Sequence, residues 1–304
     1  MILNEKTRVF VSGCGGMLGD AVYKYLSSRC VVLATDIDTK EEPWINYGDV
    51  RDYQKIYKIV RYFSPDLIVN LAALTDLELC EKDPENTWKT NALGAENMAL
   101  ISQNLNVPHI YISTAGIFDG KQEYYNDFDT PNPLSMYAKA KYYGETVVQK
   151  MLTKYFIFRA GWMMGGGPEK DKKFINKLYK QIRAGSNEIF VVNDKYGTPT
   201  YTNNFAENMF NVAQSDMYGL YNMVCGGSCT RYQVAKKFIE FLELENKVKI
   251  TEVDSEYFKK DYSAPRPESE KLVNLKLTSR GLNIMKNWEV CLKEYVGEYY
   301  VTKK

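Results

Sequence analysis

A glycine-rich segment, Gly13-Cys14-Gly15-Gly16-Met17-Leu18-Gly19, joins an apolar run at Arg8–Ser12 to an amphipathic run at Leu18–Ser27. Glycines between a strand and a helix allow a tight turn and a close approach of the backbone to a phosphate. The N-terminus of the helix then faces that anion. The order of these three parts predicts a dinucleotide-binding turn at the start of an α/β fold.

Short β-rich runs alternate with amphipathic runs through the first half of the chain, which is the pattern of a parallel sheet wrapped by helices. The strand runs are almost continuously apolar, as expected where helices cover both faces. We therefore predict a doubly wound parallel sheet with its ligand at the carboxyl ends of the strands. The predicted strands are Arg8–Ser12, Val31–Asp36, Asp66–Leu71, His109–Ser113 and Tyr155–Arg159, and the predicted helices are Leu18–Ser27, Tyr53–Phe63, Pro84–Leu105 and Met136–Leu152.

The pattern loosens after Trp162, where Gly165-Gly166-Gly167-Pro168 interrupts the chain. Further helices are predicted at Lys172–Arg183, Asn203–Ala213 and Tyr232–Leu242, with a strand at Glu188–Val192. We expect a dinucleotide-binding domain over residues 1–162, to which segments near 197–225 return. Residues 163–304 are expected to form mainly a smaller, mixed α/β substrate-binding lobe.

The composition of the chain limits which binding partners are expected. The 39 Lys+Arg and 38 Asp+Glu nearly cancel, so neither nucleic acid nor an anionic membrane is an expected partner. No apolar stretch is long enough to span a bilayer, and the first residues do not resemble a signal peptide, so a cytoplasmic protein is expected. The six cysteines form no CxxC pair and His109 is the single histidine, so no metal is expected. The 24 tyrosines suit base stacking or an interface, which keeps a homodimer among the expected arrangements.

Asp36 ends the second predicted strand, where an acidic side chain accepts hydrogen bonds from the ribose hydroxyls of adenosine. Its charge would repel the 2′-phosphate of NADP(H). The sequence therefore favours NAD(H) as the cofactor, with NADP(H) still acceptable because Lys40 is close by.

Tyr137 and Lys141 are four residues apart on a predicted helix and so share one of its faces. An ammonium beside a phenol lowers the pKa of the phenol, which lets the tyrosine exchange a proton near neutral pH. Lys139, Tyr142 and Tyr143 offer alternative pairs. The preceding strand should deliver Ser113 or Thr114 to the same pocket.

Together these residues resemble the extended short-chain dehydrogenase/reductases, Rossmann-fold enzymes that act on nucleotide-sugars, and within them the dTDP-4-dehydrorhamnose reductase group. The resemblance runs across almost the whole chain. The segments that carry it are Gly13–Gly19, Asp49-Val50, Asn70–Thr75, Ser113–Gly120, Tyr137 with Lys141, Arg159–Trp162, Gly197–Thr200 and Ala264–Pro267.

The resemblance implies that Tyr137 protonates the C4 oxygen of a sugar while NAD(P)H delivers hydride to C4. Lys141 would hold the nicotinamide ribose, and Thr114 would hydrogen bond to the C4 oxygen. Leu77, Thr114, Trp162 and Arg266 would contact the substrate, with Arg183 and Arg231 as other candidates for its diphosphate. The expected cofactor contacts are Gly13, Gly16, Met17, Leu18, Gly19, Asp36, Asp49, Val50, Ala73, Leu74, Thr75, Tyr137 and Lys141.

One departure from the reductase group is that Thr114 is followed by Ala115-Gly116 rather than by Asp-Tyr. This change disfavours a 4,6-dehydratase, and small residues there are familiar in the C4 epimerases of the superfamily, which keep NAD tightly bound. The expected activity is reduction of the C4 keto group of a nucleoside-diphosphate-linked 4-keto-6-deoxysugar, in deoxysugar and polysaccharide biosynthesis. The alternatives are a nucleotide-sugar C4 epimerase and a non-catalytic, dinucleotide-binding regulatory subunit.

Overall fold

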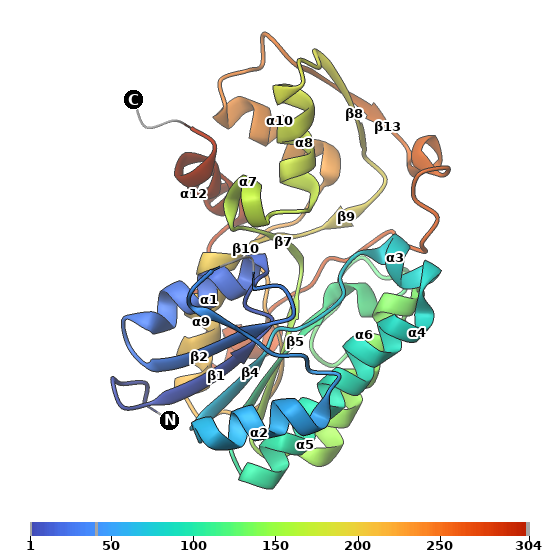
Figure 1. The fold of residues 1–304 in the computed structure, drawn as a ribbon. Helices are drawn as coiled ribbons and strands as arrows, with labels where there is room; N and C mark the ends of the chain where they lie inside the picture. The colour runs from blue at the N-terminus through green and yellow to red at the C-terminus, as the bar shows by residue number, and fades with distance from the viewer. Residues whose placement is uncertain (1, 40–41, 302–304) are drawn as a thin grey trace.

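The computed structural model describes residues 2–39 and 42–301, and its centre is one sheet of seven parallel strands (Figure 1). The strand order is β11-β6-β5-β4-β1-β2-β3, so the chain reverses direction across the sheet between β1 and β4. In doubly wound sheets ligands bind at this reversal, outside the carboxyl ends of the strands. The strands are β1 (Arg8–Ser12), β2 (Val31–Asp36), β3 (Ile45–Tyr47), β4 (Leu67–Asn70), β5 (His109–Thr114), β6 (Tyr155–Ala160) and β11 (Gly219–Asn222).

Helices cover both faces of this sheet, which confirms the predicted doubly wound α/β fold. Val9 and Val11 of β1 point to the face packed by α1 (Met17–Ser27) and α9 (Thr202–Gln214). Phe10, between them, points to the face covered by α2 (Tyr53–Phe63) and α5 (Gly94–Leu105), beside α6 (Met136–Met151). All three of these side chains are fully buried, as the continuous apolar runs predict for a sheet covered on both faces.

The predicted helix over Pro84–Leu105 is interrupted in the structure. It consists of α4 (Pro84–Trp88), a π-helical turn at Lys89–Leu93, and α5. A π-turn has no period that a sequence pattern reveals, and such turns occur frequently at functional sites. The short α3 (Leu77–Lys82) precedes this segment and begins at the Asp76 side chain, which accepts a hydrogen bond from the backbone N–H of Leu79.

A second apolar core lies beyond the carboxyl ends of the central strands, in the upper part of Figure 1. It is built mainly from α8 (Phe174–Arg183), α10 (Arg231–Phe241) and α12 (Trp288–Tyr299) with the paired strands β8 (Glu188–Val192) and β13 (Lys249–Val253). The other elements of this part are β7 (Trp162–Met164), α7 (Gly167–Lys170), β9 (Tyr196–Gly197), β10 (Pro199–Tyr201), β12 (Cys229–Thr230) and a 3₁₀ turn at Ser255–Phe258. The short α11 (Leu275–Ser279) packs instead on β11 of the central sheet.

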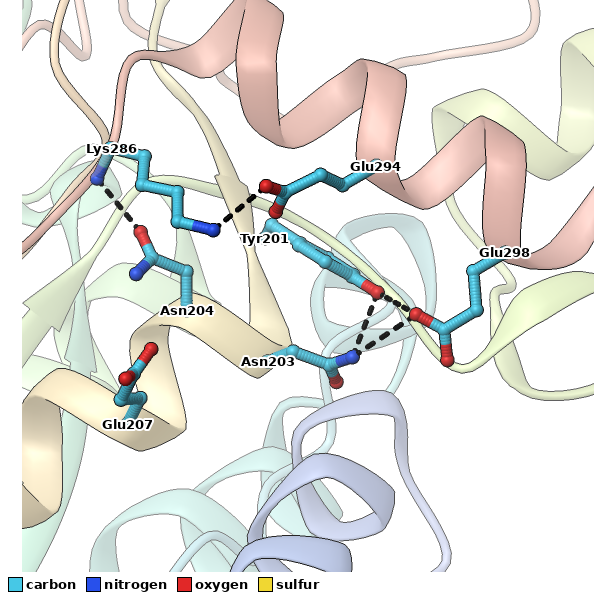
Figure 2. Close-up of a pocket in the computed structure, with 7 residues that line it drawn as sticks. All are labelled: Tyr201, Asn203, Asn204, Glu207, Lys286, Glu294 and Glu298. Carbon is cyan, nitrogen blue, oxygen red and sulfur yellow. Dashed lines mark hydrogen bonds and ion pairs between the residues drawn. The ribbon is translucent and has the colours of Figure 1, made fainter.

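A polar pocket between α9 and the C-terminal helix α12 is shown in Figure 2. Lys286 Nζ pairs with Glu294 at 2.7 Å, and the backbone N–H of Lys286 donates to Asn204 Oδ1 at 2.9 Å. Tyr201 donates its hydroxyl proton to Glu298. The pocket shares no residue with the predicted site. Its hydrogen bonds and ion pair connect the α12 segment to α9 of the sheet domain.

Two further findings concern the expectations on partners and on His109. Within residues 2–39 and 42–301, no helix is both long and apolar enough to cross a membrane. His109 is fully buried at the start of β5, where Nδ1 lies 2.8 Å from Ser102 Oγ. Burial lowers the pKa of His109 to about 3, so the ring stays neutral and its role is structural.

Candidate active site

The glycine turn lies at the reversal point of the sheet, between β1 and α1. Gly13 has φ of +80°, and a Cβ there would lie 2.5 Å from the backbone nitrogen of Ala72, which follows β4. A Cβ on Gly19 would lie 2.4 Å from Cys14 Cα. Both positions therefore require glycine, the first for the turn and the second for the close packing of α1 on the turn.

The N-terminus of α1 is left open. Gly16 is its N-cap, and none of the described side chains caps the helix, whereas Ser135 caps α6 and Thr230 caps α10. The first amides of an uncapped helix, here those of Met17 and Leu18, are donors in need of a partner, and the helix dipole favours an anion at this end. This end of α1 therefore fits the pyrophosphate of a dinucleotide.

Asp36, at the carboxyl end of β2, faces the same turn. Its Oδ2 accepts a hydrogen bond from the Gly15 N–H at 2.8 Å, and its Oδ1 accepts one from the Asp38 N–H at 3.0 Å. The carboxylate is thus held at the edge of the glycine turn, beside the place where a ribose would lie. Lys40, which was considered with Asp36 for cofactor choice, lies outside the described residues.

Asp49 and Val50, the predicted adenine contacts, follow β3. Arg51 donates to both carboxylate oxygens of Asp49, with its Nε 2.9 and 3.0 Å from them, and these hydrogen bonds lower the pKa of Asp49. The Val50 carbonyl accepts a hydrogen bond from the buried Asn97 side chain at 2.8 Å. Asn97 on α5 is a positioning residue that no sequence motif indicates.

The segment after β4 carries the predicted contacts Ala73, Leu74 and Thr75. Asn91, in the π-turn, binds both backbone groups of Leu74: its Oδ1 accepts from the N–H at 2.8 Å, and its Nδ2 donates to the carbonyl at 2.9 Å. Lys173 Nζ donates to the Thr75 carbonyl at 2.7 Å and to its hydroxyl at 3.1 Å. The π-turn therefore fixes the strand-end segment, although the sequence gives no signal for it.

Tyr137 and Thr114 come together where α6 begins beside the carboxyl end of β5. Ser135 fixes the start of α6, since its hydroxyl accepts a hydrogen bond from the Ala138 N–H at 3.2 Å. Burial raises the pKa of Tyr137 above its ordinary value, and a hydrogen bond from Thr114 lowers it in part. Tyr137 is therefore protonated at neutral pH, the form a proton donor needs.

Lys141 lies one turn after Tyr137 on α6 and is 3% exposed. Burial lowers its pKa to about 7, an effect that the charge of Glu145 opposes. Its Nζ lies 4.1 Å from the ring centroid of Tyr111, and none of the described residues accepts a hydrogen bond from it. A buried ammonium without an acceptor fits the ribose hydroxyls of a nicotinamide nucleotide as its partners.

The expected effect of Lys141 on Tyr137 needs a correction. The sequence suggested that the ammonium lowers the pKa of Tyr137, but in the structure the pKa of Tyr137 is raised because burial dominates. Lys141 is itself only partly charged near pH 7 in the protein alone, for the same physical reason. Tyr137 therefore carries its proton at neutral pH in the protein alone.

The wall facing Thr114 is formed by Trp162 and side chains of the second half of the chain. The Arg231 guanidinium lies 3.6 Å from the Trp162 ring centroid, and Trp162 Nε1 donates to Glu270 Oε2 at 2.5 Å. Burial lowers the pKa of Arg231 to about 10. The sequence predicts Trp162 as a substrate contact and Arg231 as one of three candidate arginines for the diphosphate. It does not indicate Glu270.

Leu77 and Arg266, the other predicted substrate contacts, are linked through Glu78. Leu77 begins α3, and the next residue, Glu78, pairs through Oε1 with Arg266 at 2.7 Å. Oε2 of Glu78 accepts hydrogen bonds from Ser263 and Ala264. The guanidinium of Arg266 is therefore held against α3, while Arg183 lies in the last turn of α8.

An open helix end at the sheet reversal, with a tyrosine, a lysine and a threonine at the ends of the neighbouring elements, is the arrangement of the extended short-chain dehydrogenase/reductases. These are pyridine-nucleotide-dependent oxidoreductases. More narrowly, the chain belongs to the RmlD substrate binding domain family, whose model matches residues 7–301.

Three known proteins illustrate what the chain is similar to. It is 28% identical over 293 residues to the spore coat polysaccharide biosynthesis protein SpsK of Bacillus subtilis, and the matched region covers 96% of this chain and 98% of SpsK. It is 28% identical, with a TM-score of 0.87, to the solved dTDP-4-dehydrorhamnose reductase of Bacillus anthracis in complex with NADP, covering 96% of this chain and 99% of that one. The UDP-glucose 4-epimerase of Thermus thermophilus, solved with NAD, is similar in fold, at 21% identity and a TM-score of 0.79 over 97% of this chain and 100% of the epimerase.

Proposed function

We propose that this chain reduces the C4 keto group of a nucleoside-diphosphate-linked 4-keto-6-deoxysugar with NAD(P)H, as a dTDP-4-dehydrorhamnose reductase does. The observation that carries the proposal is the position of Tyr137 beside Thr114 at the carboxyl end of β5, where burial raises the pKa of Tyr137. A carbonyl reductase needs a proton donor there, because the oxygen of C4 gains negative charge as hydride arrives at the carbon. The reduced nicotinamide supplies that hydride when it is bound.

In this mechanism the Tyr137 hydroxyl donates its proton to the C4 oxygen. The Thr114 hydroxyl stabilises the phenolate that is left, since its hydrogen bond is the contact that lowers the pKa of Tyr137. Lys141 holds the nicotinamide ribose by its Nζ, and hydrogen bonds to the ribose hydroxyls favour the charged form of the lysine. The proton lost by Tyr137 is replaced from solvent before the next turnover.

The basic residues that we assign to the diphosphate of the substrate lie in the second half of the chain. Burial lowers the pKa of Lys173, and the charges of Lys177 and Arg231 lower it further, while Asp76 and Asp171 oppose them. A cation whose pKa is lowered by neighbouring cations gains stability when an anion joins them. We propose that Lys173 and Arg231 bind the diphosphate. We also propose that residues 163–304 form mainly the substrate-binding lobe of a cytoplasmic enzyme. Within that range, α9 and β11 belong to the cofactor-binding domain.

The test of this function is turnover of a defined substrate. Purified protein is mixed with NADH or NADPH and a panel of nucleotide-linked 4-keto-6-deoxysugars, and cofactor oxidation is followed by absorbance. We expect oxidation with at least one keto sugar and none with its 4-hydroxy counterpart. A protein that purifies with tightly bound NAD and interconverts 4-hydroxy epimers without added reductant would be an epimerase. A stoichiometric enzyme partner without any turnover would identify the regulatory subunit.

The choice between NADH and NADPH depends on Asp36. Its carboxylate at the end of β2 repels a 2′-phosphate, so we propose NADH as the preferred reductant, although the Bacillus anthracis relative was solved with NADP. Asp36→Ala should narrow the ratio of kcat/KM for NADH over NADPH by about 10- to 100-fold, since hydrogen bonds to charged groups contribute about 1.5–3 kcal/mol. Both cofactors are measured by steady-state kinetics.

Asp66→Ala is the matched control, because Asp66 precedes β4 at the opposite end of the sheet and should leave the ratio unchanged. An unchanged ratio in Asp36→Ala as well would mean that this carboxylate serves only the amides of Gly15 and Asp38.

A further inference from the structure

Glu270 is held rigidly beside the proposed reaction centre by its backbone. Its N–H donates to the Tyr196 carbonyl at 2.8 Å, and the Tyr196 N–H donates to the Glu268 carbonyl at 2.8 Å. On its other side this segment packs on Gly120, where a Cβ would lie 2.5 Å from the Glu268 nitrogen. The position of Glu270 is therefore fixed by two separate parts of the chain.

The two carboxylate oxygens of Glu270 have different surroundings. Oε2 accepts the hydrogen bond from Trp162 Nε1 at 2.5 Å. Oε1 points toward Gly116: a Cβ built on that glycine would lie 3.3 Å from Oε1 and 3.5 Å from Thr114 Oγ1. Oε1 and the threonine hydroxyl thus both lie beside Gly116, and a side chain at residue 116 would contact both of them.

Oε1 has no donor of its own among the described residues. Burial raises the pKa of Glu270, while the Trp162 hydrogen bond and the charge of Arg231 lower it. Glu270 is partly buried, and its Oε1 remains an available acceptor. A substrate hydroxyl beside Gly116 would supply the donor for it.

We propose that Glu270 is a specificity-determining residue whose Oε1 accepts a hydrogen bond from the sugar hydroxyl next to C4. This inference rests on the function proposed above, which puts the C4 oxygen between Tyr137 and Thr114. Of the two carbons adjacent to C4 in a 6-deoxyhexose, C5 carries the methyl group and the ring oxygen, so only C3 offers a hydroxyl. Glu270 therefore selects substrates with a hydroxyl on C3.

The experiment compares two keto sugars that differ only at C3, one with the hydroxyl and one 3-deoxy. The enzyme is studied as wild type, as Glu270→Ala and as Glu270→Gln, with thermal melting and cofactor binding as checks on folding. Glu268→Ala, two residues away with an exposed side chain, is the control. The measured quantity is the ratio of kcat/KM for the two sugars.

We expect the wild type and Glu268→Ala to prefer the 3-hydroxy sugar by about 10- to 100-fold, the range that one hydrogen bond to a charged group gives. Glu270→Ala should lose that preference, so that kcat/KM for the two sugars becomes similar. Should Glu270→Ala not fold, Glu270→Gln, which keeps the size of the side chain and an acceptor for Trp162, must reduce the preference.

An unchanged ratio in every folded Glu270 variant, with both sugars slowed alike, would overturn the inference and leave Glu270 as a support for Trp162. If the wild type reduced neither sugar, nor any other in the panel, the proposed function itself would be at fault. The two failures are therefore distinguishable.

Discussion

Replacing Tyr137 by phenylalanine is expected to lower kcat for keto-sugar reduction by about 10²- to 10⁴-fold, the range that a positioned general acid contributes. The substitution removes one oxygen and keeps the ring that packs at the start of α6. In the proposed mechanism Tyr137 is the proton source for the C4 oxygen, and water would not replace it at the same rate. Steady-state and single-turnover kinetics with saturating cofactor measure the loss.

KM for the cofactor should stay close to the wild-type value in Tyr137→Phe, because Lys141 and the glycine turn are untouched. Tyr143→Phe is the matched control: Tyr143 lies on the same helix, where its hydroxyl donates to Glu96 at 3.0 Å on the surface. Undiminished reduction in Tyr137→Phe would remove Tyr137 from the mechanism.

Glu145→Ala is expected to cost about 3–5 kcal/mol of folding free energy, as breaking a buried ion pair does. Arg159 and Glu145 are 4% and 1% exposed, with the guanidinium and the carboxylate joined at 3.0 and 2.8 Å. Without Glu145 the charge of Arg159 stays buried between β6 and α6. Urea unfolding followed by circular dichroism gives the change in free energy.

Two further variants test whether the unpaired charge of Arg159 causes the loss of stability in Glu145→Ala. Glu145→Leu combined with Arg159→Met should regain most of the loss, because neither charge is then left unpaired. Glu256→Ala removes a partner of the exposed Lys259 and should leave the unfolding midpoint unchanged. A loss in Glu145→Ala no larger than that of Glu256→Ala would contradict the structural role given to the buried pair.

The sheet was largely predictable because its strands are buried on both faces. Arg8–Ser12 and Val31–Asp36 have the bounds that the sequence pattern predicts. The prediction missed β3, only three residues long, and β11, whose Gly219-Leu220-Tyr221-Asn222 lacks a β-branched residue. Strands this short are defined by their neighbours in the sheet rather than by their own composition.

The site was predictable where local geometry demands a particular residue. Gly13 and Gly19 are required by backbone contacts, and Tyr137 and Lys141 by their spacing on one helix face. Glu270 was not predictable, because its place beside Gly116 depends on pairing with Tyr196 and packing on Gly120, far away in the sequence. Ala115 and Gly116 offer no polar side chain, so the sequence left open what contacts the sugar there. In the structure the Glu270 carboxylate, from another segment, lies beside Gly116.

The measurement that most directly tests the account follows the hydride. The protein is incubated with a nucleotide-linked 4-keto-6-deoxysugar and reduced cofactor carrying deuterium at C4 of the nicotinamide, on each face in separate reactions, and the sugar is examined by NMR. The account predicts one deuterium at C4 of the product, from one cofactor face only, with one cofactor oxidised for each sugar reduced. Recovery of the 4-keto sugar without cofactor oxidation and without deuterium at C4 would contradict it.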